Sequence, residues 1–109
     1  MTPLVSILIA YPAPSPYLEE ALAGIERQTY RNFEVILLPD EPSGRAWPVW
    51  CTEMPTGKIR PAEKRNLGLA KARGEIIAFL DDDAWPVDSW LEKALSHFAT
   101  CENVGVAGP

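Results

Sequence analysis

The chain has 109 residues, 47% of them hydrophobic and 23% charged, which is typical of one soluble globular domain and excludes a disordered chain. Fifteen acidic against ten basic residues give a net charge of −5, which argues against a general nucleic-acid-binding protein. No apolar run approaches the roughly 20 residues of a membrane-spanning helix, and no basic residue precedes the first apolar run. Neither a transmembrane segment nor a signal peptide is therefore expected.

Short apolar runs along the chain predict strands that are buried on both faces. Residues 4–10, 33–38 and 75–80 are such runs, rich in β-branched side chains, and residues 103–107 are expected to begin a fourth strand. Residues 39–60 contain several prolines and glycines without a clear period, so they are predicted to form a long loop. Loops of this length in compact domains are usually functional or disordered.

Amphipathic helices are predicted between these strands. The first covers residues 16–28, with Ser15 as its N-cap and a proline at its first position. The second covers residues 61–73, with Gly74 as its C′ residue. A third helix is expected to follow Asp88, which can act as its cap.

The alternation of strands and helices predicts an α/β fold, with a parallel sheet, right-handed crossovers and helices on both faces. Gly68 lies inside the second predicted helix, where glycine costs about 1 kcal/mol relative to alanine. We therefore expect another element to pack closely against Gly68.

Acidic side chains follow two of the predicted strands. Asp40 and Glu41 follow the second, Asp81–Asp83 follow the third, and Tyr11 follows the first. Since ligands bind beyond the carboxyl ends of parallel strands, these residues are expected to share one edge of the sheet. Carboxylates gathered there would repel each other unless a cation neutralised them, and oxygen ligands without His or Cys favour Mg²⁺ or Mn²⁺. Three aspartates after a strand are also compatible with a solvated turn.

Basic residues cluster next to this edge. Six of the ten lie between positions 58 and 73, and four of them precede or begin the second predicted helix, where free backbone N–H groups attract anions: Lys58, Arg60, Lys64 and Arg65. A cation beside such a helix start is what a diphosphate requires. Three tryptophans in predicted loops either pack against the core or stack on a base or a sugar: Trp47, Trp50 and Trp85.

Four segments, taken together and in this order, resemble the nucleotide-binding half of a family 2 glycosyltransferase: residues 4–10, 28–36, 64–70 and 74–83. The resemblance covers essentially the whole chain. It implies a Rossmann-like GT-A fold and the metal-dependent, inverting transfer of a sugar from a nucleotide-diphosphate donor to an acceptor. On this basis residues 1–109 are expected to be a single donor-binding, N-terminal part of a truncated GT-A domain.

The same resemblance assigns site residues by position. Asp81–Asp83 match the D-x-D motif, which implies that Asp83 ligates a Mg²⁺ or Mn²⁺ ion on the donor diphosphate, with Asp81 beside the ion or the ribose. Arg65 is the expected direct contact within the stretch beside the donor. The implied nucleotide-sugar site comprises Tyr11, Asp40, Glu41, Lys64, Arg65, Asn66, Asp81 and Asp82.

The chain departs from the family pattern at two strand ends. Pro39 stands where members usually have the first of two aspartates, so either Asp40 or Glu41 is expected to contact the base. Residues 12–15 offer only a hydroxyl where members carry Asn or an acidic residue. The nucleobase, as UDP or GDP, and the sugar therefore stay open.

No catalytic residue is assigned. An inverting transfer needs a general base, and none of Asp88, Glu92 and Glu102 stands at the family's position for it. We therefore expect this chain alone to bind a donor without transferring sugar. Cys51 and Cys101 are expected to stay reduced.

Two other classes of function remain open from the sequence. One is a non-catalytic nucleotide-binding module, and the other is a Mg²⁺-dependent nucleotidyltransferase or phosphatase that uses the Asp81-x-Asp83 spacing. A cytoplasmic location is expected, with peripheral membrane association open for the full-length protein. An unpaired strand at the sheet edge would favour a homodimer.

Overall fold

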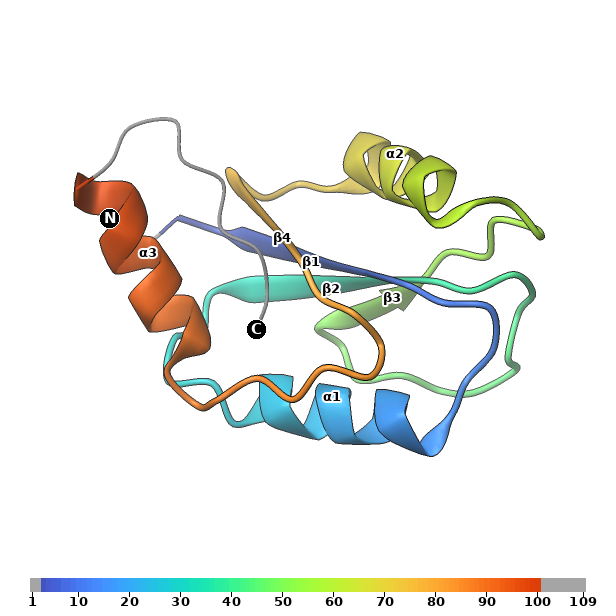
Figure 1. Cartoon of the computed structure of the whole chain (residues 1–109), viewed down its shortest axis with the longest axis horizontal. Coiled ribbons are helices and arrows are strands. Elements are labelled where there is room, and N and C mark those ends of the chain that lie inside the picture. The colour runs from blue at the N-terminus through green and yellow to red at the C-terminus, as the bar shows by residue number, and fades with distance from the viewer. Residues whose placement is uncertain (1–2, 101–109) are drawn as a thin grey trace.

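The computed structural model describes residues 3–100, with side chains through residue 96. Within these residues, four parallel strands form one sheet in the order β3-β2-β1-β4, and three helices accompany it (Figure 1). Among residues 3–100, none of the helices combines the length and apolarity that crossing a bilayer requires. The elements in chain order are β1 (Val5–Ala10), α1 (Pro16–Glu26), β2 (Phe33–Leu38), β3 (Cys51–Glu53), α2 (Pro61–Lys71), β4 (Ile76–Phe79) and α3 (Trp90–Thr100).

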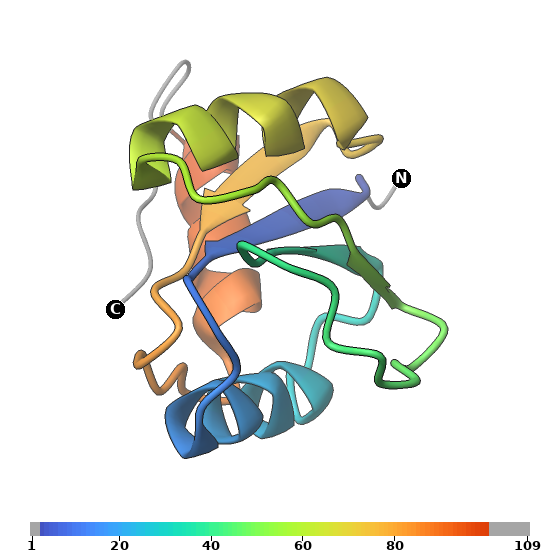
Figure 2. The same cartoon turned by 90° about the vertical axis from the view of Figure 1, so that its right-hand side faces the viewer.

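Strand β1 is the centre of the sheet. Its residue Ile7 is in register with Val35 of β2 on one side and with Ala78 of β4 on the other, and both pairings are parallel. Helices α1 and α2 lie on opposite faces of the sheet, as the end-on view shows (Figure 2). The predicted parallel α/β sheet with helices on both faces is therefore confirmed.

The sheet separates two hydrophobic cores. The larger core lies on the α1 face, where Ile7 and Ile9 of β1 meet Leu18 and Ile25 of α1, together with Trp90 from the start of α3. The smaller core lies under α2 and centres on three buried side chains: Leu8, Ile36 and Leu38. Each fully buried aliphatic side chain of this kind stabilises the fold by about 1.5–3 kcal/mol.

Helix α1 begins as predicted and ends earlier. The Ser15 side chain accepts a hydrogen bond from the Leu18 backbone N–H at 3.4 Å, which confirms it as the N-cap. Helix α3 begins at Trp90 rather than directly after Asp88, and the Asp88 carboxylate instead pairs with Arg27 at 3.5 Å. The interpretation of Asp88 as the cap is therefore not supported.

The prediction that Gly74 is the C′ residue of the second helix is wrong. Helix α2 ends at Lys71, and Ala72 is already extended with φ −64° and ψ 136°. Gly74 lies instead against β1, where an added Cβ would be 2.5 Å from Ser6 Oγ. Its backbone N–H donates to that oxygen at 2.8 Å, so glycine is required for close approach rather than for a helix end.

The predicted loop over residues 39–60 contains the short strand β3, which sequence periodicity missed. Its residue Cys51 is in register with Val35 of β2, and the Met54 N–H donates to the Leu37 carbonyl at 2.7 Å. Three residues are too few for an alternating pattern to be recognised. The predicted strand over 103–107 and Cys101 lie outside the described residues.

Cys51 is a buried free thiol. Burial, and secondarily the charge of Glu53, raise the pKa of its thiol to about 12. The side chain is therefore protonated and unreactive at neutral pH.

At Gly68, α2 lies close against the sheet. A Cβ added there would lie 2.8 Å from Leu8 Cδ2 and 2.9 Å from Leu38 Cδ1. Both leucines are almost fully buried. The expectation of close packing at Gly68 is confirmed.

We expect Gly68→Ala to lower the free energy of unfolding by about 1 kcal/mol, because overpacking costs roughly 1–3 kcal/mol and alanine recovers only about 1 kcal/mol of helix propensity. Chemical denaturation measures the change. Asn66→Ala, on an exposed position of the same helix, is the control and should be neutral or slightly stabilising. A stabilised Gly68→Ala variant would contradict the close contact.

A polar cluster fastens the amino-terminal end of the sheet. Glu34 accepts hydrogen bonds from the Ser6 hydroxyl at 2.5 Å, from the Arg73 backbone N–H at 2.8 Å and from Arg73 Nε at 3.1 Å. Burial alone would raise the pKa of Glu34, but these hydrogen bonds and the Arg73 charge outweigh it and lower the pKa. Ionised Glu34 therefore stabilises the fold.

Because the pKa of Glu34 is lower in the folded chain, its contribution is complete above the unfolded value of 4.5 and is lost as the pH falls through the folded value. We expect Glu34→Gln to lower the free energy of unfolding by about 1 kcal/mol at neutral pH. The difference from the unaltered chain should shrink below the unfolded pKa, as measured by denaturation at several pH values. Glu20→Gln, at an exposed position of α1, should show neither effect.

Candidate functional site

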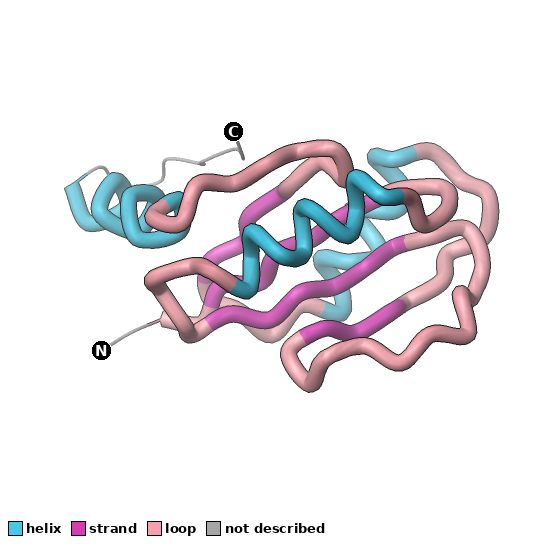
Figure 3. The backbone as a smooth tube through the Cα atoms, turned by 90° about the horizontal axis from the view of Figure 1, so that it is seen from below, coloured by secondary structure: helices cyan, strands magenta, loops and turns pink. Residues whose placement is uncertain are grey.

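The carboxyl ends of the strands meet at one edge of the sheet, to the right in Figure 1. Helices α1 and α2 both begin at this edge, because each follows a loop that leaves the carboxyl end of a strand. Seen from below, α1 crosses the sheet and the loops gather at the same side (Figure 3). Backbone N–H groups at a helix start are free to bind an anion.

An open pocket of about 420 Å³ lies at this edge. It is lined by residues from four separated parts of the chain, including Tyr11, Asp40, Lys64 and Asp82. The structure thus brings together four of the residues that the sequence predicts for the site.

A second hollow of about 470 Å³ shares Pro12, Asp40 and Lys58 with this pocket and extends it toward Glu41 and Ser43. We call the two hollows together the edge pocket. Its outer part is formed by the segment that follows β2, as expected for Asp40 and Glu41.

Lys64 is the buried charge of the edge pocket, with only 3% of its surface exposed. Its ammonium lies 2.6 Å from Asp40 Oδ1 and donates to the carbonyls of Leu38 at 3.1 Å and Tyr11 at 3.3 Å. The ion pair neutralises Asp40 within the chain. The Asp40 side chain keeps 21% of its surface exposed.

The Tyr11 side chain packs into the larger core and is only 2% exposed. Its hydroxyl has no hydrogen-bond partner among the described residues. Burial, followed by the charge of Glu53, raises the pKa of Tyr11 well above its usual value. Tyr11 therefore borders the edge pocket as a neutral side chain whose ring is largely covered.

Asp81–Asp83 form a turn directly after β4, closed by a hydrogen bond from the Ala84 N–H to the Asp81 carbonyl at 3.0 Å. Asp81 and Asp83 are exposed, whereas Asp82 is partly buried and lines the edge pocket. Burial raises the pKa of Asp82, and the neighbouring charges of Asp83 and Asp81 add to this effect.

Arg65 forms an ion pair with this turn, and its guanidinium lies 3.8 Å from Asp81 Oδ1. The guanidinium also lies 5.8 Å from the centre of the Phe79 ring. Asn66 is exposed on α2 and does not line the edge pocket. Its predicted contact with a nucleotide stays a prediction.

The carboxylates at this edge do not form the single cluster that the sequence predicts. Within residues 3–100 no group of three or more His, Cys, Asp or Glu side chains is arranged to hold a metal ion. Asp40 is paired with Lys64, whereas Asp81 and Asp83 are exposed at the turn after β4. The turn offers exposed oxygen ligands that suit a hard divalent ion only if a ligand such as a diphosphate completes the coordination.

Glu53, at the carboxyl end of β3, is a residue that the sequence analysis missed. Its carboxylate accepts from the Ser43 N–H at 3.2 Å and from Trp47 Nε1 at 3.3 Å, and so orders the loop that borders the edge pocket. An acidic residue after a strand is the same signal that identified Asp40, but here the strand itself was not predicted.

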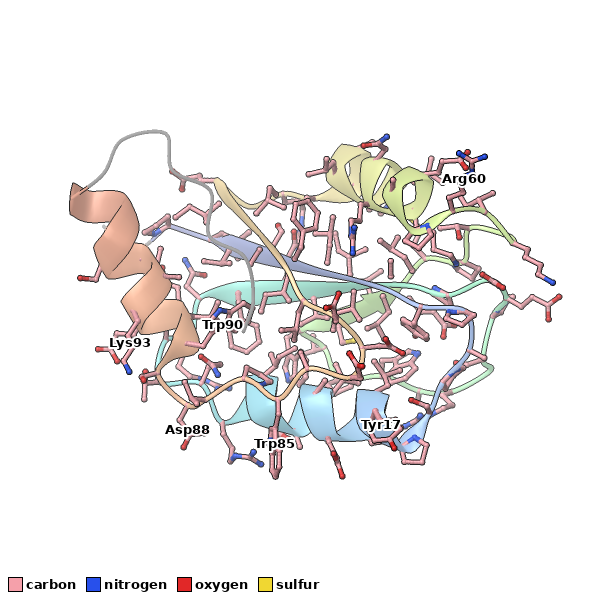
Figure 4. The ribbon with its side chains drawn as sticks, viewed as in Figure 1. Tyr17, Arg60, Trp85, Asp88, Trp90 and Lys93 are labelled. Atoms are coloured by element: carbon pink, nitrogen blue, oxygen red, sulfur yellow. The ribbon has the colours of Figure 1, made fainter. Side chains whose placement is uncertain are left out.

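Two of the loop tryptophans have packing roles. Trp47 is partly buried beneath the Arg45 guanidinium, which lies 4.4 Å from its ring, and Trp50 packs edge-on against Phe33 with ring centres 5.7 Å apart. Trp85 is 70% exposed and lies on the α1 side of the molecule, whereas Arg60 lies at the start of α2 (Figure 4).

Comparison with known protein families gives a match over nearly the whole chain. The family model described as glycosyl transferase family 2 matches residues 6–109. An uncharacterized glycosyltransferase of Haemophilus influenzae is 31% identical over 105 residues, and the putative glycosyltransferase EpsH of Bacillus subtilis is 34% identical over 104 residues. Both alignments cover 86% of this chain, but the chain spans only 42% and 30% of the length of these curated relatives.

Solved structures share the fold. The mannosyltransferase PcManGT from Pyrobaculum calidifontis, in complex with GDP-Man and Mn²⁺, has a TM-score of 0.80 at 26% identity and is matched over 91% of this chain and 33% of its own. TarS of S. aureus, in complex with UDP-GlcNAc, has a TM-score of 0.72 at 19% identity, over 94% of this chain and 36% of its own. The predicted GT-A-like fold is confirmed by these matches.

Like-charge repulsion in the Asp81–Asp83 turn can be measured directly. We expect Asp83→Asn to lower the pKa of Asp82 part of the way toward its usual value, because one neighbouring charge is removed while the burial remains. The carboxyl carbon of Asp82 can be followed by NMR during a pH titration. Asp88→Asn is the control and should leave the titration of Asp82 unchanged. If Asp83→Asn leaves the titration of Asp82 unchanged, the charge of Asp83 does not contribute to the raised pKa of Asp82.

Proposed function

The chain belongs to glycosyltransferase family 2, and we propose that it is the donor- and metal-binding portion of an enzyme that transfers a sugar from a nucleotide-diphosphate sugar to an acceptor with inversion. The observation that carries this proposal is the edge pocket, where Asp40, Lys64 and Asp82 meet beside the start of α2. In open α/β sheets this is the edge at which nucleotides bind.

The nucleoside is proposed to occupy the outer part of the edge pocket. Asp40 and Glu41 line this part, and their carboxylates can accept hydrogen bonds from base N–H or ribose hydroxyl groups. Both UDP and GDP offer such donors, so the proposal leaves the base open. Tyr11 forms part of the inner wall.

The diphosphate is proposed to lie between the start of α2 and the Asp81–Asp83 turn. Lys58 lines the edge pocket on one side, and Arg65 reaches the turn on the other. Positive side chains and free helix N–H groups compensate the negative charge of phosphates. Without a divalent cation, however, the diphosphate would face three aspartates, of which Asp81 has the Arg65 guanidinium at 3.8 Å.

A divalent cation removes this conflict. Asp83 and Asp81 would hold Mg²⁺ or Mn²⁺, since both are exposed at the turn and have oxygen ligands that such ions prefer. When bound, the ion would neutralise the diphosphate and so assist its departure from the sugar. Burial, followed by the charges of Asp83 and Asp81, raises the pKa of Asp82, and the same ion would offset the repulsion from these two charges.

The general base for the acceptor hydroxyl is not assigned to the described residues. Asp88 is paired with Arg27, and Glu92 accepts from the Thr29 hydroxyl at 2.7 Å. Both side chains therefore bind groups at the end of α1, away from the edge pocket. A catalytic role for either is not part of the proposal.

Calorimetric titration of the 109-residue chain with UDP and with GDP tests the proposal. We expect weak binding of at least one nucleotide that requires Mn²⁺ or Mg²⁺, because the turn accepts a diphosphate only with a cation. Asp83→Ala should weaken binding by about tenfold or more. Loss of a residue that only supports a metal ligand already costs about tenfold or more in metal affinity, and loss of a ligand itself should cost at least as much. Binding that is equally tight without a cation would contradict the metal assignment.

The matched control is Asp88→Ala, which removes an exposed aspartate a few residues further along the same loop. It should leave nucleotide binding unchanged. A phosphomonoester provides a second control, since release of phosphate by the chain would favour the phosphatase alternative.

A further inference from the structure

Lys64 is buried, unlike a surface lysine that contacts a ligand phosphate. It is a lysine with 3% of its surface exposed, in a chain whose other basic residues are mostly at the surface. A buried ammonium is costly unless each of its three N–H groups has a partner. In this structure three oxygens lie within hydrogen-bond distance of Nζ.

The three partners come from two strands. The Tyr11 carbonyl follows β1, and the Leu38 carbonyl ends β2; Asp40 Oδ1, two residues further, lies 2.6 Å from the nitrogen. The ammonium therefore fastens the carboxyl ends of the two central strands to each other and to the Asp40 side chain. A ligand phosphate could bind this ammonium only by displacing one of these oxygens.

Asp40 connects this buried charge to the edge pocket. Its side chain is 21% exposed and lines both hollows, while one of its two carboxylate oxygens is held by Lys64. The other oxygen is left to accept a hydrogen bond from a ligand in a fixed direction. The backbone supports this geometry, since the Asp40 N–H donates to the Pro12 carbonyl at 3.1 Å.

We infer that Lys64 is a positioning residue for nucleotide binding, which acts by holding Asp40 in the orientation that a nucleoside N–H or O–H group requires, rather than by contacting the donor. This inference rests on the proposed function. It predicts that the effects of Lys64 and Asp40 on nucleotide affinity are coupled.

A double-mutant cycle measures this coupling. The unaltered chain, Lys64→Met, Asp40→Asn and the double variant are titrated with UDP and GDP in the presence of Mn²⁺. Each single variant is expected to bind about tenfold more weakly. If the double variant also binds only about tenfold more weakly, the two losses are coupled by about tenfold, which is within the range found for residues in contact. The double variant should bind no more weakly than Asp40→Asn alone. Once the Asp40 carboxylate is absent, Lys64 has nothing to position, so its removal causes no further loss.

Controls separate positioning from loss of the fold. Thermal denaturation checks that each variant is folded, and Lys64→Gln, which keeps an N–H donor for the strand carbonyls, replaces Lys64→Met if that variant does not fold. Lys71→Met removes an exposed lysine from the last turn of the same helix and should change neither affinity nor stability. The Nζ signal of Lys64 in ¹⁵N NMR should shift in Asp40→Asn.

The outcomes are distinct. Two results would overturn the positioning role and leave the proposed function intact. One is a loss of nucleotide affinity in the double variant that equals the sum of the two single losses, and the other is a Lys64 Nζ signal that does not shift in Asp40→Asn. Failure of the unaltered chain to bind either nucleotide with a cation would overturn the proposed function, and the positioning role with it. Coupled losses together with a shifted Nζ signal would support both.

Discussion

The burial of one positive charge sets the relation between α2 and the sheet. Lys64 and Gly68 are four residues apart and therefore lie on the same face of the helix. Lys64 requires oxygen partners at the ends of β1 and β2, while Gly68 allows the helix backbone to approach Leu8 and Leu38. A polar contact and an apolar contact one turn apart thus determine both the height and the direction of α2 above the sheet. Because α2 begins at the edge pocket, the same two contacts also place the residues proposed to receive a diphosphate.

Negative charge at the edge pocket is compensated in two different ways. Asp40 has an internal partner in Lys64 and is neutralised whether or not a ligand is present. Among the described residues, the Asp81–Asp83 turn is paired only with the Arg65 guanidinium, 3.8 Å from Asp81, and burial followed by the charges of Asp83 and Asp81 raises the pKa of Asp82. The charge of Asp40 is therefore compensated by a buried residue of the chain itself, whereas most of the charge of the Asp81–Asp83 turn can be compensated by a bound cation. This division agrees with a site in which a cation arrives with its ligand.

Sequence patterns predicted the parts of the fold that depend on long, regular burial. The continuous apolar run of β1, the two amphipathic helices and the placement of Tyr11, Asp40 and Asp82 at one edge all follow from strand polarity and periodicity. Three features could not be predicted because they depend on contacts between distant segments. Strand β3 is three residues long and exists because β2 offers it a partner; Gly74 is set by Ser6, 68 residues away. The partner of Lys64 is likewise unrelated to any local pattern. The sequence therefore predicts a lysine available to a donor, whereas the structure has a buried lysine paired with Asp40.

The loop from Leu80 to Trp90 is anchored near its carboxyl end by contacts with α1 and with Gln28. Pro86 is buried against Gly24 of α1, at 3.0 Å from where a Cβ would stand, and the Gln28 amide donates to the Val87 carbonyl at 2.6 Å. Gln28 also accepts from the Leu91 N–H at 3.0 Å. Only the few residues between Leu80 and Pro86 can rearrange without breaking these contacts. Since fixing a backbone residue costs roughly 1–2 kcal/mol, this anchoring would limit the conformational entropy that the Asp81–Asp83 turn loses if it binds a ligand.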